Sequence, residues 1–208
     1  MFDYCLIMGN AKSANVSDFV RANKVLQKVL SQEVKLRFPR LPCMEHLVFK
    51  VYSDASFGNL NGGGSQGGFV IFLCDAEVSK AIPLHWRSLR VKRVVKSTLA
   101  AETLALVDAA KSCFWLQKLY EEMTETVGSS IICYTDNESL YKTVYLTTSD
   151  TDKRLQIDIS ILREILSNGE ISKVNWVNTK FQLADCLTKI GAPSDNLIAT
   201  LMDGVLSQ

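Results

Sequence analysis

The sequence predicts an α/β fold, with helices flanking a mixed β-sheet. Two observations support this prediction. Strand-like apolar runs and segments of helical periodicity follow one another in the order β-β-β-α-β-α-α-β-α, and the first three strands are joined closely enough for an antiparallel meander. With 208 residues, the chain suits one medium domain with extensions and is short for two full domains.

The composition indicates an ordinary globular protein. Hydrophobic residues make up 47% of the chain, charged residues 22%, and the formal net charge is +1, so the overall charge points to no partner. The six cysteines lack the paired spacing of zinc sites, which is typical of reduced thiols in an intracellular protein. No apolar run approaches the roughly 20 residues of a membrane span. We therefore expect a cytoplasmic or nuclear protein without a membrane partner.

The first 46 residues predict an N-terminal helical extension. Apolar side chains recur at helical spacing over residues 17–32, which indicates one amphipathic helix. Pro39 and Pro42 follow this helix, so a domain boundary is expected near residues 40–46.

The body of the chain is expected to contain five strands and four helices. Apolar runs predict the strands at residues 47–54, 69–75, 81–89, 130–136 and 171–178. Helical periodicity predicts the helices at residues 97–123, 137–146, 151–169 and 181–191. The glycine-rich stretch 58–68 predicts a turn or flexible loop, and the tail 192–208 is expected to be helical.

Three acidic residues are expected to meet at one edge of the sheet. Asp54 and Asp136 each end a strand-like run, where the sheets of α/β proteins gather their ligands. Glu102 falls at the centre of the apolar stripe of the helix 97–123 and therefore points towards the sheet. A buried carboxylate must shift its pKa, find a cation or bind a metal. Singly, each acid is better explained by helix capping or an ion pair, but together they can converge on a hard cation such as Mg²⁺.

The order of the motifs resembles the ribonuclease H domain that closes the reverse transcriptase polyprotein of copia-type retrotransposons. The resemblance is carried by YSDAS, STLAAE, YTDN, KRLQIDI with LRE, and WVNTKFQLADCLTK, between about Leu47 and Gly191. It implies a ribonuclease H-like fold, a five-stranded mixed sheet flanked by helices, with an N-terminal helical extension. The domains it implies are a remnant of the reverse transcriptase connection region at 1–46, the ribonuclease H-like domain at 47–191, and a C-terminal tail at 192–208.

The resemblance also implies an activity, namely cleavage of the RNA strand of RNA-DNA hybrids. The catalytic carboxylates of such enzymes hold two Mg²⁺ ions, for which Mn²⁺ can substitute, and they correspond to Asp54, Glu102, Asp136 and Asp185. The assignment of Asp185 as a catalytic residue rests on the resemblance alone, because Asp185 lies away from the apolar face of the expected helix 181–191. In such enzymes the ions activate a water for in-line attack on the phosphodiester and stabilise the leaving 3′-oxygen.

Two departures from that family qualify the resemblance. The chain lacks the aromatic-x-Asp-Asp motif of polymerases and the residues for fingers and palm, so this chain alone does not synthesise DNA. Cellular ribonucleases H carry a histidine on a mobile loop before the last catalytic aspartate. The two histidines here, His46 and His85, lie elsewhere, so turnover is expected to be slow.

A basic stretch predicts where nucleic acid binds. Five cations lie within ten residues between the third strand and the long helix, namely Arg87, Arg90, Lys92, Arg93 and Lys96. A solvated charged loop is the alternative. The resemblance adds Asn59, Ser65 and Gln66 as contacts to 2′-hydroxyl groups. It also adds Asn137, for which helix capping is the stronger alternative.

Two other functions stay open at this stage. The chain can be a catalytically silent module that binds nucleic acid or docks to a polymerase, or a nuclease of the same fold that acts on DNA. DNA nucleases of this fold usually gather three acids, so the fourth, Asp185, favours the ribonuclease. The expected partners are an RNA-DNA hybrid and, through residues 1–46, a reverse transcriptase or a second copy of the chain.

Overall fold

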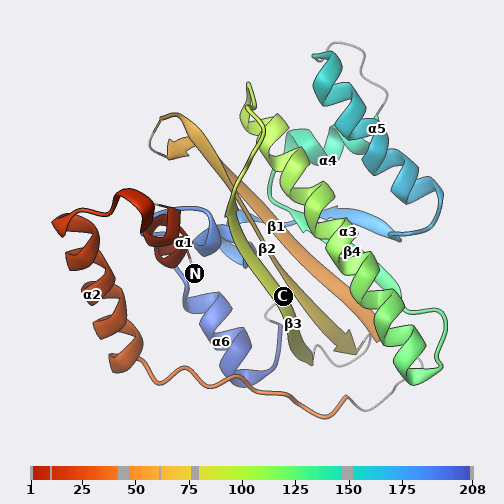
Figure 1. Cartoon of the computed structure of the whole chain (residues 1–208). Coiled ribbons are helices and arrows are strands. Elements are labelled where there is room, and N and C mark those ends of the chain that lie inside the picture. The colour runs from red at the N-terminus through yellow and green to blue at the C-terminus, as the bar shows by residue number, and fades with distance from the viewer. Residues whose placement is uncertain are drawn as a thin grey trace.

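A single mixed sheet forms the centre of the molecule (Figure 1). The computed structural model describes residues 2–9, 11–41, 47–60, 62–75, 80–146 and 152–206. The strands are β1 (Leu47–Leu60), β2 (Gly64–Asp75), β3 (Ala81–Arg90), β4 (Ser130–Thr135) and β5 (Lys173–Trp176), in the order β3-β2-β1-β4-β5. The first three pair antiparallel, whereas β4 lies parallel to β1 and β5 parallel to β4. The predicted five-stranded mixed sheet is confirmed.

Helices cover both faces of the sheet and extend the chain at its N-terminus. The α-helices are α1 (Phe2–Gly9), α2 (Val16–Ser31), α3 (Thr98–Thr124), α4 (Glu138–Tyr145), α5 (Lys153–Ser167) and α6 (Asp195–Asp203). Short 3₁₀ turns are η1 (Ala11–Ser13), η2 (Thr179–Phe181) and η3 (Asp185–Leu187). Among the described helices, none has the length and apolar character needed to cross a membrane.

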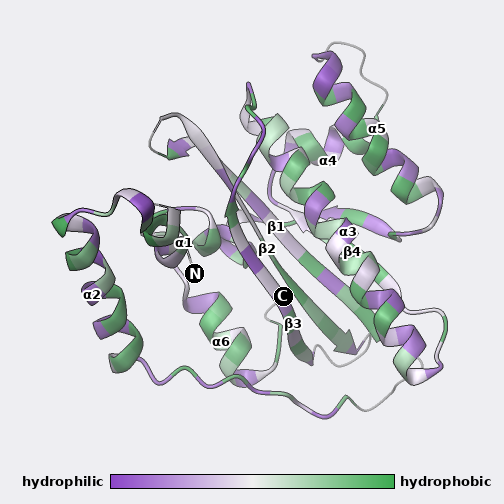
Figure 2. Cartoon of the chain, viewed as in Figure 1, coloured by the Kyte–Doolittle hydropathy of each residue, from purple (hydrophilic) through white to green (hydrophobic). Residues whose placement is uncertain are grey.

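The sheet buries one apolar core on each face. Strand alternation turns Phe49 and Val51 of β1 towards α3, where they pack with Leu106. Tyr52 points to the opposite face and packs in a second cluster that includes Leu187. Figure 2 shows hydrophobic residues concentrated along the strands and on α3. With both faces covered, β1 is buried from residue 51 to residue 56, and its polar side chains there are held in a protected interior.

The glycine-rich stretch 58–68 differs from the predicted loop. β1 continues to Leu60 and β2 begins at Gly64, so most of the stretch is paired strand. Glycine supplies a left-handed conformation at Gly58 of β1, with φ of 67°, and in the turn at Gly62 and Gly63, with φ of 76° and 72°. The loop prediction was wrong because the stretch pairs as a hairpin, in which Gly68 allows the close approach of Leu187 and Thr188.

The predicted helix 181–191 is also absent. The described chain forms two 3₁₀ turns there, η2 and η3, and no α-helix. The side chain of Gln182 fixes this path, because its Nε2 donates to the carbonyl of Ser53 and its Oε1 accepts from the backbone N–H of Ala184. Apolar residues four apart, Leu183 and Leu187, pack equally well on consecutive turns, so their spacing could not distinguish the two structures.

The N-terminal extension forms the helix that its periodicity predicts. α2 begins one residue earlier than expected, after an Asn15 capping box, and ends at Ser31. It buries none of its residues, and the side chains of Phe19 and Leu30 are 66% and 75% exposed. The expected boundary near residues 40–46 falls mostly on 42–46, outside the described residues. The C-terminal tail contains α6, as expected for its helical character.

Candidate active site

Two neighbouring parallel strands bring two aspartates to the same place. β1 and β4 pair in register from Val48–Ser130 to Tyr52–Tyr134, and the two tyrosine rings stack with centroids 4.7 Å apart. Asp54 and Asp136 each lie two residues beyond that tyrosine pair. Since side chains two apart share a face of a strand, both carboxylates extend from the face that carries the stacked rings. The segments 52–54 and 134–136 share the order tyrosine, hydroxyl residue, aspartate, and the paired register explains why the same order delivers a carboxylate from each.

Glu102 joins the two aspartates from the other face of the sheet. α3 starts after Ser97, whose Oγ accepts from the backbone N–H of Ala100 at 3.1 Å. Glu102 therefore lies one turn into the helix, and it is 4% exposed, as its place in the apolar stripe predicts. The pairing of β1 with β4 stops at the tyrosines, so side chains from both faces can meet beyond them.

The three carboxylates form a cluster that could hold a metal ion. Asp54, Glu102 and Asp136 each offer an oxygen, and these oxygens lie within 4.8 Å of one another. The Oε2 atom of Glu102 is buried without a hydrogen-bond partner among the described residues. Carboxylate oxygens are the ligands that Mg²⁺ and similar hard cations prefer, and an orphaned buried oxygen is a group that such a cation would satisfy.

The electrostatics of the cluster indicate a shortage of positive charge. Burial raises the pKa of Glu102 well above its usual value, and the negative charges of Asp54 and Asp136 raise it further. Burial also raises the pKa of Asp54, although the nearby Lys189 ammonium and a hydrogen bond from Thr188 act in the opposite direction. A carboxylate held in this way gains most from a cation, because the cation favours its charged form.

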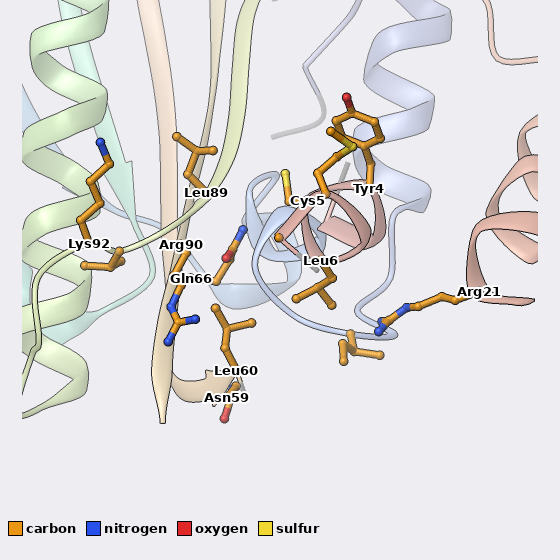
Figure 3. A pocket seen from close by; sticks show the side chains of 14 residues that line it. Tyr4, Cys5, Leu6, Arg21, Asn59, Leu60, Gln66, Leu89, Arg90 and Lys92 are labelled. Atoms are coloured by element: carbon orange, nitrogen blue, oxygen red, sulfur yellow. The ribbon is translucent and has the colours of Figure 1, made fainter. Parts of the chain in front are cut away.

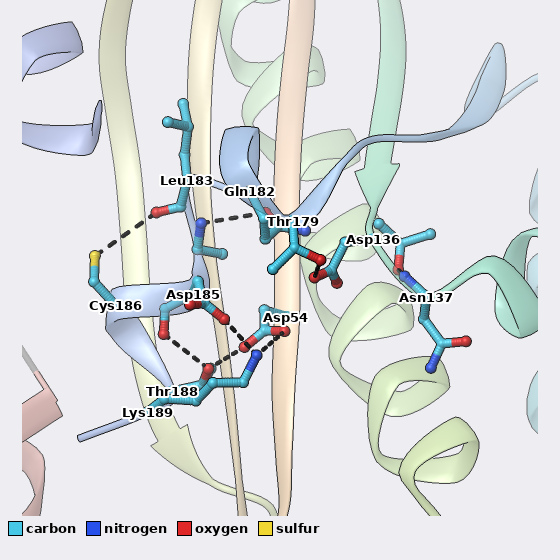
Figure 4. A network of polar contacts seen from close by, with 12 residues as sticks. Asp54, Asp136, Asn137, Thr179, Gln182, Leu183, Asp185, Cys186, Thr188 and Lys189 are labelled. Atoms are coloured by element: carbon cyan, nitrogen blue, oxygen red, sulfur yellow. Dashed lines mark hydrogen bonds and ion pairs between the residues drawn. The ribbon is translucent and has the colours of Figure 1, made fainter. Parts of the chain in front are cut away.

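The last residue of β5 and a residue of the turn after it hold Asp136 in position (Figure 4). Thr179 Oγ1 donates to Asp136 Oδ2 at 2.9 Å, and the indole N–H of Trp176 donates to the backbone carbonyl of Asp136 at 3.0 Å. Sequence reasoning did not single out Thr179. Its only signal is its place in the WVNTKFQLAD motif, a few residues before Asp185.

Asp185 reaches the cluster through a lysine rather than by direct contact. The ammonium of Lys189 forms ion pairs with Asp54 Oδ1 at 3.3 Å and with Asp185 Oδ1. Thr188 Oγ1 donates to Asp54 Oδ2. The side chain of Asp185 is 16% exposed, so the residue lies beside the buried acids instead of on the open surface. Sequence reasoning missed Lys189 and Thr188, although Lys189 follows Asp185 at the i,i+4 spacing of an ion pair.

Gly68 makes room for this last part of the site. A Cβ atom there would lie 2.9 Å from both Leu187 Cβ and Thr188 Cγ2, closer than real side chains approach. β2 pairs Gly68 with Asp54 of β1, so the glycine lies directly beside the buried aspartate. The missing side chain lets η3 and Thr188 pack against the strand next to Asp54.

The basic stretch is less uniform than the sequence suggested. Three of its five cations are in ion pairs: Arg87 with Asp108 at 3.1 Å, Arg93 with the buried Asp158, and Lys96 with Asp152 at 3.1 Å. Arg90 and Lys92 are exposed and form no ion pair with any acid in the described part of the chain. Of the five cations of this stretch, these two therefore offer a positive charge that no described acid shares.

Arg90 and Lys92 line a cavity of about 880 Å³ between α1 and the β1-β2 hairpin (Figure 3). Asn59 and Tyr4 also line it. Gln66 lies in its wall but is buried, and its Nε2 donates to Ser88 Oγ at 2.9 Å. The cavity therefore combines polar and aromatic side chains with three cations, of which Arg21 is already paired with Asp3.

Two other residues predicted to contact nucleic acid make bonds within the fold. Asn137 caps α4, because its Oδ1 accepts from the backbone N–H of Leu140 at 2.9 Å. Ser65 is buried and its Oγ accepts from the backbone N–H of Gly58 at 3.1 Å. Of the histidines, His85 packs against Phe69 in the sheet, and His46 lies outside the described residues.

Comparisons with known proteins relate the chain to transposons. The chain is 27% identical over 145 residues to the retrovirus-related Pol polyprotein from transposon RE2 of Arabidopsis thaliana, and 28% identical over 145 residues to that from transposon RE1. Both matches cover 69% of the chain, which spans only about a tenth of the length of these relatives. The chain matches no protein-family model.

A solved structure shows the same fold. The crystal structure of RNase H1 from the halophilic archaeon Halobacterium salinarum NRC-1 matches 68% of the chain and 94% of its own length, with a TM-score of 0.51 and 17% sequence identity. The resemblance predicted from the motifs is confirmed by this fold together with the transposon relatives. The chain has a ribonuclease H-like fold and is similar in sequence to the Pol polyproteins of transposons.

Proposed function

We propose that the chain is a metal-dependent endoribonuclease that cleaves the RNA strand of RNA-DNA hybrids in the replication of a retrotransposon. The observation that carries this proposal is the meeting of Asp54, Glu102 and Asp136, with Asp185 beside them, in a ribonuclease H-like fold. These acids come from two strands, a helix and a turn that lie far apart in the sequence. Such a nuclease would act in the cytoplasm or the nucleus.

The metal ions that fit this site are two Mg²⁺ ions, with Mn²⁺ as a substitute. Asp54, Glu102 and Asp136 would hold one, and Asp54 and Asp185 the other. Bound ions of this kind supply activation of a water for in-line attack and charge stabilisation of the leaving 3′-oxygen. The chain itself positions the carboxylates, since β1 and β4 fix the two aspartates and Thr179 orients Asp136 through a hydrogen bond of 2.9 Å.

The cavity beside Arg90 and Lys92 is the proposed contact with the nucleic-acid backbone. Phosphates contribute most of the affinity of such complexes, and these two cations have no acidic partner among the described residues. Asn59 lines the same cavity and offers an amide to a 2′-hydroxyl group. Arg87, Arg93 and Lys96 are assigned a lesser part, because each is already paired with an aspartate of the chain.

Cleavage assays test the proposal directly. Labelled RNA-DNA hybrid, double-stranded RNA and duplex DNA are incubated with the chain in Mg²⁺ or in EDTA. We expect cleavage of the hybrid alone, dependent on Mg²⁺ and lost in Asp136→Asn. Glu164→Gln, which changes an exposed acid of α5, serves as the matched control and should cut like the unmodified chain. Cutting that persists in EDTA or in Asp136→Asn would exclude the proposed site.

A second candidate is a catalytically silent module that binds nucleic acid or a polymerase. The position of Lys189 favours it, because an ammonium already neutralises Asp54 and Asp185. The exposed apolar side chains of α2 offer a docking surface to a reverse transcriptase or to a second copy of the chain. Hybrid binding without cleavage in Mg²⁺ and in Mn²⁺ would support this candidate, and sedimentation of the full chain would report self-association.

A further inference from the structure

Lys189 is a cation built into the acidic site. Its ammonium lies 3.3 Å from Asp54 Oδ1 and forms a second ion pair with Asp185 Oδ1 (Figure 4). The carboxyl side chain of Asp54 is 1% exposed, whereas the side chain of Lys189 is 37% exposed. The lysine therefore spans the site from the buried aspartate to the surface.

The two ends of the site differ in how their charge is balanced. At the Asp185 end, the Lys189 ammonium contacts both Asp54 and Asp185, and Thr188 donates a hydrogen bond to Asp54. At the other end, Glu102 has a buried oxygen without a partner among the described residues, and no described cation is in ion-pair contact with Glu102 or Asp136. One end is thus open to a cation, and the other already holds one.

We propose that Lys189 is a positioning residue that serves as an internal counter-ion for Asp54 and Asp185 and must leave before a divalent ion can bind between them. The inference rests on the proposed function, because it concerns the second of its two metal positions. The Asp54 and Asp185 oxygens that contact the ammonium are the ones a cation at this end would need, so lysine and metal compete for them. In the chain without nucleic acid, the first ion binds at the Glu102 end and the second binds weakly.

The lysine can leave without unfolding the site. Its side chain is long, partly exposed and follows η3, so rotation about its own bonds carries the ammonium into solvent. Thr188 keeps its hydrogen bond to Asp54 during this movement, and Gln182 keeps the turn fixed to Ser53. The displaced ammonium would then lie in solvent at the surface of the site.

Titration with Mn²⁺ in the absence of nucleic acid tests the competition. Calorimetry is expected to find one tight and one weak ion for the unmodified chain, and a second ion bound about tenfold or more tightly in Lys189→Met. Lys173→Met, which removes an exposed lysine at the start of β5, should bind like the unmodified chain. Without metal, Lys189→Met should melt a few degrees lower, because Asp54 loses its buried partner, and Mn²⁺ should raise its melting temperature more than that of the unmodified chain.

A charge-preserving variant makes the outcome decisive. Lys189→Arg should melt like the unmodified chain without metal and should bind the second ion no more tightly. If folded Lys189→Met shows unchanged Mn²⁺ binding and an unchanged metal-free melt, the counter-ion role is wrong while the metal site stands. If Lys189→Arg binds like Lys189→Met, charge is not the cause and the inference fails. If neither the unmodified chain nor any variant binds Mn²⁺, the proposed function fails together with the inference.

Discussion

The acidic cluster and the basic stretch lie on neighbouring elements but are held in opposite ways. Asp54 and Glu102 are buried, and their positions follow from the register of β1 with β4 and from the first turns of α3. The cations of residues 87–96 are carried by the exposed end of β3 and the connection to α3. Ion pairs with acids of α3 and α5 and with the cap of α5 neutralise three of them.

This difference separates charge that is fixed by the fold from charge that can be rearranged. Moving a buried carboxylate requires a change in the sheet or the helix that carries it. Moving a cation whose partner is also exposed costs little, since exposed ion pairs contribute at most about 1 kcal/mol. Arg93 is the exception among the paired cations, because its partner Asp158 is buried. The acids can therefore define a chemical site, whereas the cations define a surface whose charge depends on its partners.

Loss of one buried acid should have the largest effect. Glu102→Gln is expected to reduce cleavage of an RNA-DNA hybrid by more than the roughly 10–100-fold that loss of an outer-shell partner costs a metal site. Its melting temperature without metal should equal or exceed that of the unmodified chain, because one of the mutually repelling carboxylates is removed. Hybrid cleavage and thermal melts measure both. An unfolded variant would mean that Glu102 supports the fold instead of the site.

Displacing the turn beside Asp54 should have the next largest effect. Gly68→Ala places a Cβ 2.9 Å from Leu187 Cβ and Thr188 Cγ2, so we expect a loss of about 1–3 kcal/mol, or roughly 2–4 °C in melting temperature for each kcal/mol. Gly67→Ala is the matched control, because its nearest contact, Ala105 Cβ, is at an ordinary 3.5 Å. Equal melting of the two variants would contradict the close packing of η3 on β2.

The pH dependence of stability should reveal the charge shortage of the cluster. The pKa of Glu102 is raised above 4.5, so the folded chain binds its proton more tightly than the unfolded chain does. The stability that protonation gives is complete below about pH 4.5 and is lost as the pH rises through the raised pKa. Without metal, the unmodified chain should therefore lose stability relative to Glu102→Gln over this range in urea titrations. Parallel curves for the two chains would show that Glu102 is not perturbed.

The smallest effects are expected at the cations. Arg90→Gln with Lys92→Gln should weaken hybrid binding and reduce the slope of log affinity against log salt by about one to two, since each phosphate contact contributes roughly 0.9. The matched double variant, Arg87→Gln with Lys96→Gln, should change the slope less, because both side chains are already paired. Hybrid binding measured over a range of salt concentrations distinguishes the two double variants. Equal slopes would mean that the paired and the unpaired cations contribute alike to binding.

The positions of the three clustered acids could largely be predicted because regular periods carry them. The apolar stripe of α3 fixes where Glu102 points, and β4 ends just before Asp136, as its strand-like run predicts. The predicted strand end at Asp54 was wrong, because β1 continues past it to Leu60 in pairing with β2. The place of Asp185 could not be derived from periodicity, because two 3₁₀ turns replace the expected helix. The path of those turns depends on a long-range hydrogen bond from Gln182 to Ser53, which no local pattern records.

The glycine stretch and the basic stretch were harder to interpret for a related reason. Composition suggested a flexible loop at 58–68, yet most of the stretch is paired strand, and Gly68 makes room for Leu187 and Thr188, more than a hundred positions away. Likewise, the partner of Arg93 is Asp158, buried in α5, which sequence spacing does not link to it. The local composition of a segment gives its residue types but does not show which distant element packs against it.

β1 has hydrogen-bonded neighbours on both sides from Val48 to Tyr52, so these amides before Asp54 are expected to exchange with deuterium only when the whole domain unfolds. The segment that carries Asp185 and Lys189 has only a few short-range backbone hydrogen bonds, such as that from Thr188 to Asp185. Its amides should exchange by local opening, many times faster. The part of the site that carries Asp185 and Lys189 would thus open locally on a short timescale, whereas the part that carries Asp54 would open only when the domain unfolds.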